Sequence, residues 1–87
     1  MLGEVLVVDG FGNAITNVPG EVLDDQSGGE IRVDGEPAPV ARSYAHVDPG
    51  QRLVTVGSHG NVELAVNRGR GDDAFGVRAG DEVALSW

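Results

Sequence analysis

The sequence predicts an all-β fold in which about seven short strands form a small closed barrel or a sandwich. Three observations lead to this prediction. Glycine and valine, which are both poor helix formers, each occur fourteen times in 87 residues. No window repeats its apolar residues with helical spacing, whereas alternation with period 2 recurs along the chain. Turn residues separate the alternating segments, and a closed barrel is favoured because closure removes exposed strand edges.

Six alternating segments are the predicted strands. They span residues 4–8, 14–18, 30–33, 53–56, 62–66 and 82–87. The first is apolar on both faces, which is typical of a strand that is covered on both sides. The third turns Ile31 and Val33 to one face, the predicted interior. In the last, Val83, Leu85 and Trp87 form the apolar face.

Turn chemistry fills the breaks between these strands. The turns are expected at residues 9–12, 19–20, 24–29, 34–35, 48–50 and 79–81. Gly57-Ser58-His59-Gly60 is predicted to be the hairpin loop between strands 53–56 and 62–66. Only residues 72–75 have a composition that fits a single helical turn. No internal repeat or linker is found, so residues 1–87 are expected to form one domain.

Composition excludes several classes of protein. The chain has no cysteine, which rules out disulfides, thiolate metal sites and thiol catalysis. Its longest apolar run is Val5–Val8, too short for a membrane span or a secretion signal. We therefore expect a cytoplasmic protein that does not bind membranes.

The charge balance is strongly acidic. The chain has fourteen acidic residues and six basic ones, all arginine, which gives a formal net charge of −8. This field repels a phosphate backbone, so a nucleic-acid partner is not expected. A lysine-free acidic surface fits a protein from a salt-loving organism, and the preference for arginine equally fits a high-GC genome.

Several motifs that carry chemistry elsewhere have ordinary explanations here. Ser58 and His59 are adjacent in a tight turn, where their side chains diverge, so they do not form a nucleophile–base pair. His46 and His59 lack a patterned third ligand, and no metal site is predicted. Residues 69–74 match a dinucleotide-binding pattern, but two carboxylates occupy the phosphate position and too little chain follows. No catalytic residue and no cofactor are assigned to this chain.

Two segments are better candidates for binding. In residues 9–17, Phe11 lies between two glycines and is followed by Asn13, whose amide offers a donor beside an acceptor. A purine edge has the complementary pair, and the ring offers a stacking face. In residues 57–68, Glu63, Ala65 and Asn67 would share an outward face that could meet another domain or subunit. Turn asparagines that bond their own backbone explain the same residues equally well.

The chain also resembles a known family. The segments Gly3-Glu4-Val5, 9–18, 44–50, 56–67 and 76–83 follow, in order and spacing, the C-terminal domain of the S-adenosyl-L-methionine (SAM) hydroxide adenosyltransferases, which are relatives of fluorinase and chlorinase. The Phe-Gly-Asn and Glu-Leu-Ala-Val-Asn segments are the most specific. Halogenating relatives carry arginine and tryptophan near the adenine base of the substrate, whereas this sequence has His59 and Ile15 at those positions. This difference favours the hydroxide-using branch.

The resemblance implies a small closed Greek-key β-barrel that follows a larger α/β catalytic domain, which this sequence does not contain. It also implies a homotrimer, with the substrate held between the N-terminal α/β domain of one subunit and the barrel of its neighbour. The barrel would then be the adenine-binding and assembly domain of an enzyme that hydrolyses SAM to adenosine and L-methionine, inactive alone.

The resemblance assigns the adenine site residue by residue. Asn13 would hydrogen-bond the adenine edge, and Phe11 and Tyr44 would flank the base. Ser58 and His59 would lie in the loop above it. The main chain at Asn67 and Arg68 would complete the purine contacts. The alternative is a free-standing, non-catalytic binding or oligomerisation module.

Overall fold

The computed structural model describes residues 1–26 and 29–87. The elements are β1 (Leu2–Val8), β2 (Ala14–Pro19), the 3₁₀ helix η1 (Gly20–Gln26), β3 (Glu30–Val33), β4 (Glu36–Pro39), the 3₁₀ helix η2 (Tyr44–His46), β5 (Arg52–Val56), β6 (Asn61–Val66), α1 (Gly71–Phe75) and β7 (Glu82–Ser86). All six predicted strands are present, and the predicted helical turn is α1. Part of the predicted turn over residues 24–29, Ser27 and Gly28, lies outside the described residues.

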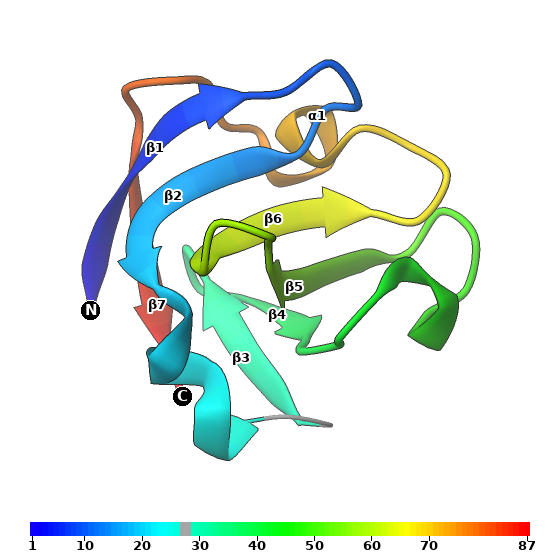
Figure 1. The fold of residues 1–87 in the computed structure, drawn as a ribbon, viewed down its shortest axis with the longest axis horizontal. Helices are drawn as coiled ribbons and strands as arrows, with labels where there is room; N and C mark the ends of the chain where they lie inside the picture. The colour runs from blue at the N-terminus through cyan, green and yellow to red at the C-terminus, as the bar shows by residue number, and fades with distance from the viewer. Residues whose placement is uncertain (27–28) are drawn as a thin grey trace.

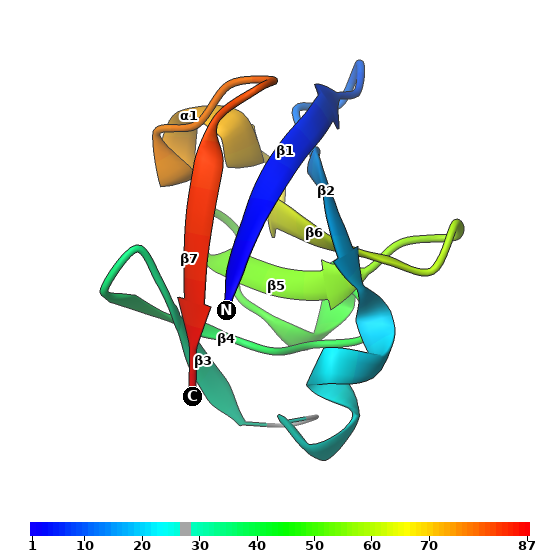
Figure 2. The same ribbon diagram turned by 90° about the vertical axis from the view of Figure 1, so that its left-hand side faces the viewer.

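The strands form one sheet that curls into a barrel, as Figures 1 and 2 show from two directions. The strand order is β4-β3-β7-β1-β2-β6-β5, and every pair of neighbours is antiparallel. Connections from β2 to β3 and from β6 to β7 pass over intervening strands, as crossing connections in Greek-key barrels do. The prediction of a small all-β barrel with about seven strands is confirmed.

The barrel is nearly closed, and its seam lies between β4 and β5. A single bridge joins Val40 to Val54 there. Pro37 and Pro39 leave β4 without N–H donors at alternate positions, which a strand tolerates only where it lacks a full ladder partner. The Arg52 side chain spans the seam, donating to the Pro37 carbonyl at 3.0 Å and pairing with Glu36 at 3.0 Å. The Arg52 side chain therefore joins β5 to β4 at a seam where backbone pairing is incomplete.

The barrel interior is filled by the inward residues of the alternating strands. Ile31, Val33, Val83 and Leu85 are all buried, as their alternation predicts. The prediction that Trp87 continues the apolar face is wrong, because β7 ends at Ser86 and the Trp87 side chain is 58% exposed.

The strand β1 is covered on one side only within this chain. A β-bulge between Val5 and Val7 turns two consecutive apolar residues outward, leaving Leu6 and Val7 52% and 48% exposed. The expectation that residues 4–8 are covered on both faces is therefore not met in this chain.

The short helix α1 lies against the outer face of β6, near the loop that follows β1 (Figure 1). A Cβ on Gly71 would overlap the Leu64 carbonyl, so glycine allows the helix to approach the strand. Ala65 beneath it is fully buried. The prediction that Glu63, Ala65 and Asn67 share an outward face is thus wrong at Ala65, because α1 covers that residue.

The two chain ends lie close together at the end of the barrel away from α1 (Figure 2). The Met1 amino group donates to the Leu85 carbonyl at 2.7 Å, which fixes the start of β1 beside β7. In the part of the chain that the structure describes, no helix has the length and apolar character needed to cross a membrane.

Candidate functional site

A cavity of about 630 Å³ lies beside the loop that connects β1 to β2. It is lined by Asp9, Phe11, Asn13, Tyr44, Gly57, Ser58, Glu63, Val66, Asn67, Arg68 and Gly69. Four separate parts of the chain meet here: the 9–13 loop, η2, the β5–β6 hairpin, and β6 with the segment after it. Six of the seven residues predicted to contact adenine line this cavity. His59 lies in the hairpin loop but not in the lining.

The 9–13 loop is organised by the Asp9 side chain. Its carboxylate accepts hydrogen bonds from the backbone N–H groups of Phe11 and Asn13, both at 2.9 Å. Burial disfavours the charged form, but these hydrogen bonds outweigh it and hold the pKa of the Asp9 carboxyl below its ordinary value. An ionised aspartate at the start of the turn thus fixes the backbone that carries Phe11 and Asn13.

The Asn13 amide is held from both sides by other side chains. Its nitrogen donates to the Asp9 carboxylate at 3.1 Å, and its oxygen accepts from the Tyr44 hydroxyl at 2.9 Å. Because a carboxylate only accepts, the nitrogen must face Asp9 and the oxygen Tyr44. One N–H and one oxygen lone pair remain for a ligand. The residue is only 8% exposed, so a ligand would reach the amide edge and little else.

Two aromatic side chains stand at the cavity with very different exposure. Phe11 is 81% exposed, because the glycines beside it provide no side chains to cover it. Tyr44 is 39% exposed and is anchored through its hydroxyl to Asn13. The structure therefore provides one fixed ring and one ring that is almost entirely open to solvent.

The main chain after β6 contributes less than the prediction assumes. The Asn67 N–H donates to the Gln51 carbonyl at 3.1 Å, and its carbonyl accepts from Gly50 at 2.6 Å. The Asn67 side chain donates to the Val47 carbonyl. Arg68 has a left-handed backbone with φ of 58°, and no main-chain hydrogen bond to it is found within residues 1–26 and 29–87. Arg68 is thus the better placed of the two to offer backbone groups to a ligand.

Glu63 was not among the predicted site residues, and it lines the cavity from β6. The carboxylate lies against Gly57, where an added Cβ would displace the Glu63 side chain. Partial burial raises the pKa of the Glu63 carboxyl, the nearby Asp9 charge raises it further, and His59 opposes both. Sequence reasoning placed Glu63 on an outward face, and only the fold shows that this part of the face borders a cavity.

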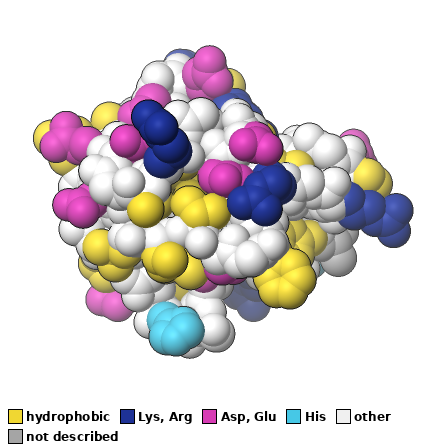
Figure 3. Space-filling model, turned by 90° about the horizontal axis from the view of Figure 1, so that it is seen from above, with side chains coloured by type: hydrophobic (Ala, Val, Ile, Leu, Met, Phe, Trp, Pro, Cys, Tyr) yellow, Lys and Arg dark blue, Asp and Glu magenta, His cyan; other side chains and the backbone are white. Residues whose placement is uncertain are grey.

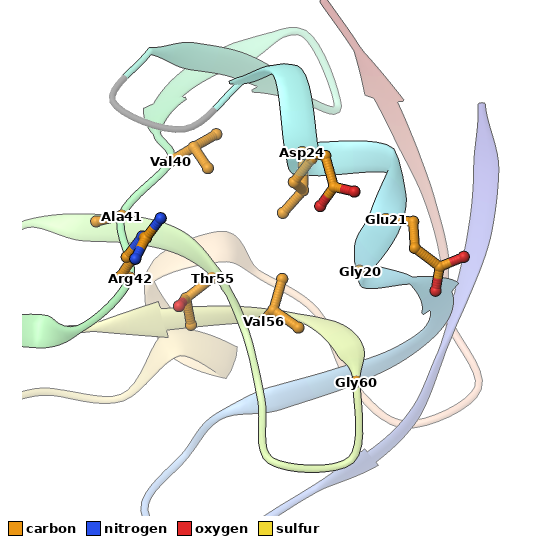
Figure 4. Close-up of a pocket in the computed structure, with 10 residues that line it drawn as sticks. Gly20, Glu21, Asp24, Val40, Ala41, Arg42, Thr55, Val56 and Gly60 are labelled. Atoms are coloured by element: carbon orange, nitrogen blue, oxygen red, sulfur yellow. The ribbon is translucent and has the colours of Figure 1, made fainter.

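A second cavity, of about 440 Å³, opens on another side of the barrel. Figure 4 shows η1, with Glu21 and Asp24, on one side of it and β5 with residues 40–42 on the other. None of the seven predicted residues lines it. Viewed from the end that carries α1, acidic and basic side chains lie next to one another among hydrophobic ones (Figure 3).

Comparison with known proteins decides which family this arrangement belongs to. Residues 3–84 match the model of the SAM hydroxide adenosyltransferase C-terminal domain. The chain belongs to this family. Two similar curated proteins are the (R)-S-adenosyl-L-methionine hydrolases of Thermus thermophilus and Salinispora tropica, 42% and 40% identical over 95% of this chain. The chain spans 31% of the length of each.

Solved structures agree with this SAM hydroxide adenosyltransferase C-terminal domain in fold. A conserved Thermotoga maritima protein of uncharacterised function matches 99% of the chain with a TM-score of 0.92 and 36% identity. A conserved hypothetical protein from Thermus thermophilus matches 97% with a TM-score of 0.78 and 42% identity. The chain covers 35% and 34% of those two proteins, so in both it corresponds to one part of a longer molecule.

Proposed function

We propose that this barrel is the adenine-binding and assembly domain of an enzyme that hydrolyses SAM to adenosine and L-methionine. The observation that carries the proposal is that six residues predicted to contact adenine line one cavity. Relatives named as SAM hydrolases, about three times as long, support the same activity for the protein to which this domain would contribute.

In the proposed reaction, water attacks the ribose C5′ carbon of SAM. The new C–O bond forms as the C–S bond breaks, the electron pair goes to sulfur, and a proton is released. Methionine leaves as a neutral thioether, and adenosine remains. The groups that activate water would come from an N-terminal α/β domain. The barrel would act by holding the adenosine half in a fixed orientation, which is a proximity effect.

The Asn13 amide is the group that we propose recognises adenine. Its free N–H and lone pair match the acceptor and donor on a purine edge, and Asp9 and Tyr44 hold it ready before the ligand arrives. Tyr44 and Phe11 would lie against the faces of the base. The high exposure of Phe11 suits a ring that becomes buried only when ligand and partner are both in place.

Exposed apolar side chains support the assembly role. Leu2, Leu6, Val7 and Trp87 are each about half or more exposed, and they lie on β1 or directly after β7. Apolar side chains gathered in this way mark surfaces that another polypeptide covers. The proposed partners are an N-terminal α/β domain of the same or a neighbouring subunit, within a homotrimer.

A domain exchange tests the proposal. This chain would replace the segment that it matches in the Thermus thermophilus SAM hydrolase, and SAM hydrolysis by the chimera would be measured. We expect activity to be retained. Asn13→Ala should raise KM by the equivalent of about 1–3 kcal/mol, because a buried polar partner is lost. Tyr44→Phe should cost less, because it removes only the hydroxyl that orients Asn13.

Asn17→Ala is the matched control, since Asn17 is exposed on β2 and its side chain accepts a hydrogen bond from the Glu4 N–H, away from the cavity. A folded, active chimera in which Asn13→Ala and Asn17→Ala have the same KM would contradict the role of Asn13. A folded chimera without activity would favour a binding or oligomerisation module instead.

A further inference from the structure

The cavity beside the 9–13 loop contains two carboxylates that the adenine contacts do not explain. Asp9 lies at the loop, and Glu63 lies on β6 against Gly57. Asp9 is engaged by loop N–H groups and by the Asn13 amide. The Glu63 side chain has no hydrogen bond or ion pair to any of the described residues, although its carboxylate is partly removed from water.

The two carboxylates line the same cavity. The Asp9 charge raises the pKa of the Glu63 carboxyl, so the cavity holds like charges at an electrostatic cost. The His59 side chain, which lies outside the lining of the cavity, lowers the pKa of the Glu63 carboxyl and so opposes this effect. A positive charge brought between the carboxylates would relieve the repulsion, whereas a negative one would increase it.

We propose that Glu63 determines the charge specificity of this cavity, admitting adenosine derivatives whose 5′ substituent is cationic and disfavouring those whose 5′ substituent is a phosphate. This inference rests on the proposed function, since it places the adenine of the ligand at Asn13. SAM carries a sulfonium at the 5′ position, adenosine is neutral, and adenosine monophosphate is an anion. A site that recognised only adenine would bind all three ligands. Nucleotides such as adenosine monophosphate would then compete with SAM.

The test compares the three ligands on the 87-residue chain. Dissociation constants would come from backbone amide shifts of residues at the cavity. Wild type should bind SAM most tightly and adenosine monophosphate least tightly. Glu63→Gln should narrow the preference for SAM over the monophosphate by at least about fivefold, because one unit-charge interaction at high effective dielectric is worth about that factor and the two ligands differ by more than one charge.

Adenosine is the internal reference, and its affinity should change little in Glu63→Gln. Glu82→Gln is the matched control, because it removes the same charge from an exposed position on β7. If Glu63 only hydrogen-bonded a ribose hydroxyl, the substitution would weaken all three ligands equally and the preference would stay unchanged, which overturns the inference.

The outcomes separate the two proposals. Adenosine binding at the cavity with an unchanged preference in Glu63→Gln overturns the charge role and leaves the proposed function standing. Absence of adenosine binding at the cavity, even with the N-terminal domain of a SAM hydrolase added in trans, overturns the proposed function and the charge role together. A preference for SAM that narrows in Glu63→Gln and persists in Glu82→Gln supports both.

Discussion

At the scale of single residues, the Asn13 amide is held in place by side chains from two other parts of the chain. A free asparagine side chain would lose rotamer freedom on binding a ligand. Here Asp9 takes one N–H and Tyr44 satisfies one lone pair, so the amide is already fixed by the chain itself. The sequence also allowed a turn asparagine that bonds its own backbone, but in the structure the Asn13 amide bonds the Asp9 and Tyr44 side chains instead and still has bonding capacity left.

The ionised Asp9 side chain makes a stability prediction. Asp9→Asn would place an amide NH₂ against the Asn13 NH₂, two donors without an acceptor, and should lower the free energy of unfolding at neutral pH by about 1 kcal/mol. The pKa of Asp9 is lowered by folding, so its contribution is present above the ordinary aspartate value of about 3.9 and is lost as the pH falls through the folded value.

Urea unfolding of both proteins across the acid range checks this. The two stability curves should converge at low pH, where wild-type Asp9 is protonated. Asp25→Asn is the control, because Asp25 is exposed on η1 and accepts no side-chain hydrogen bond from the described residues. Curves for Asp9→Asn that stay parallel to wild type down to the lowest pH would show that the ionised carboxylate does not stabilise the loop.

At the scale of elements, the 9–13 loop depends on the segment that leads into α1. The Asp72 N–H donates to the Gly12 carbonyl at 2.9 Å, and Arg70 pairs with Asp72 through two hydrogen bonds. Gly12 has φ of +86°, and a Cβ there would meet the Arg70 side chain at 2.8 Å. The loop that carries Phe11 and Asn13 is therefore supported by a helix that lies far along the chain.

Two glycine substitutions in this loop separate backbone geometry from loop composition. Gly12→Ala should lower stability by more than about 1 kcal/mol, because alanine resists positive φ and its methyl group meets Arg70. Gly10→Ala should stay within about 0.5 kcal/mol of wild type, since no atom lies within 4 Å of the added carbon. Thermal unfolding measures both, and equal losses would mean that Gly12 is not a required contact between loop and helix.

At the scale of the whole molecule, local patterns predict the barrel and long-range contacts decide its details. Alternation identified the strand of Ile31 and Val33, because period 2 is a local property. It missed β4, since prolines within Glu36–Pro39 argue against a strand and are tolerated only at the seam. It missed Glu63 as a cavity residue, because the close approach of Gly57 is a tertiary contact. The burial of Ala65 under α1 was missed for the same reason.

The candidate site was predictable to the extent that its residues lie in turns with a recognisable composition. Phe11 and Asn13 stand out because glycines and an aspartate surround them. The Tyr44–Asn13 hydrogen bond joins residues 31 positions apart, and no spacing rule predicts such a contact. The family resemblance supplied Tyr44, and the fold brought it to the amide.

The most direct measurement is a titration of the isotope-labelled 87-residue chain with adenosine, followed by amide chemical shifts. We predict shifts at Phe11, Asn13, Tyr44 and Ser58, strengthened when the N-terminal domain of a SAM hydrolase is added in trans, and no shifts at Arg42 or Thr55 of the second cavity. Unchanged spectra even with that domain present, or shifts confined to the second cavity, would contradict adenine recognition by this barrel.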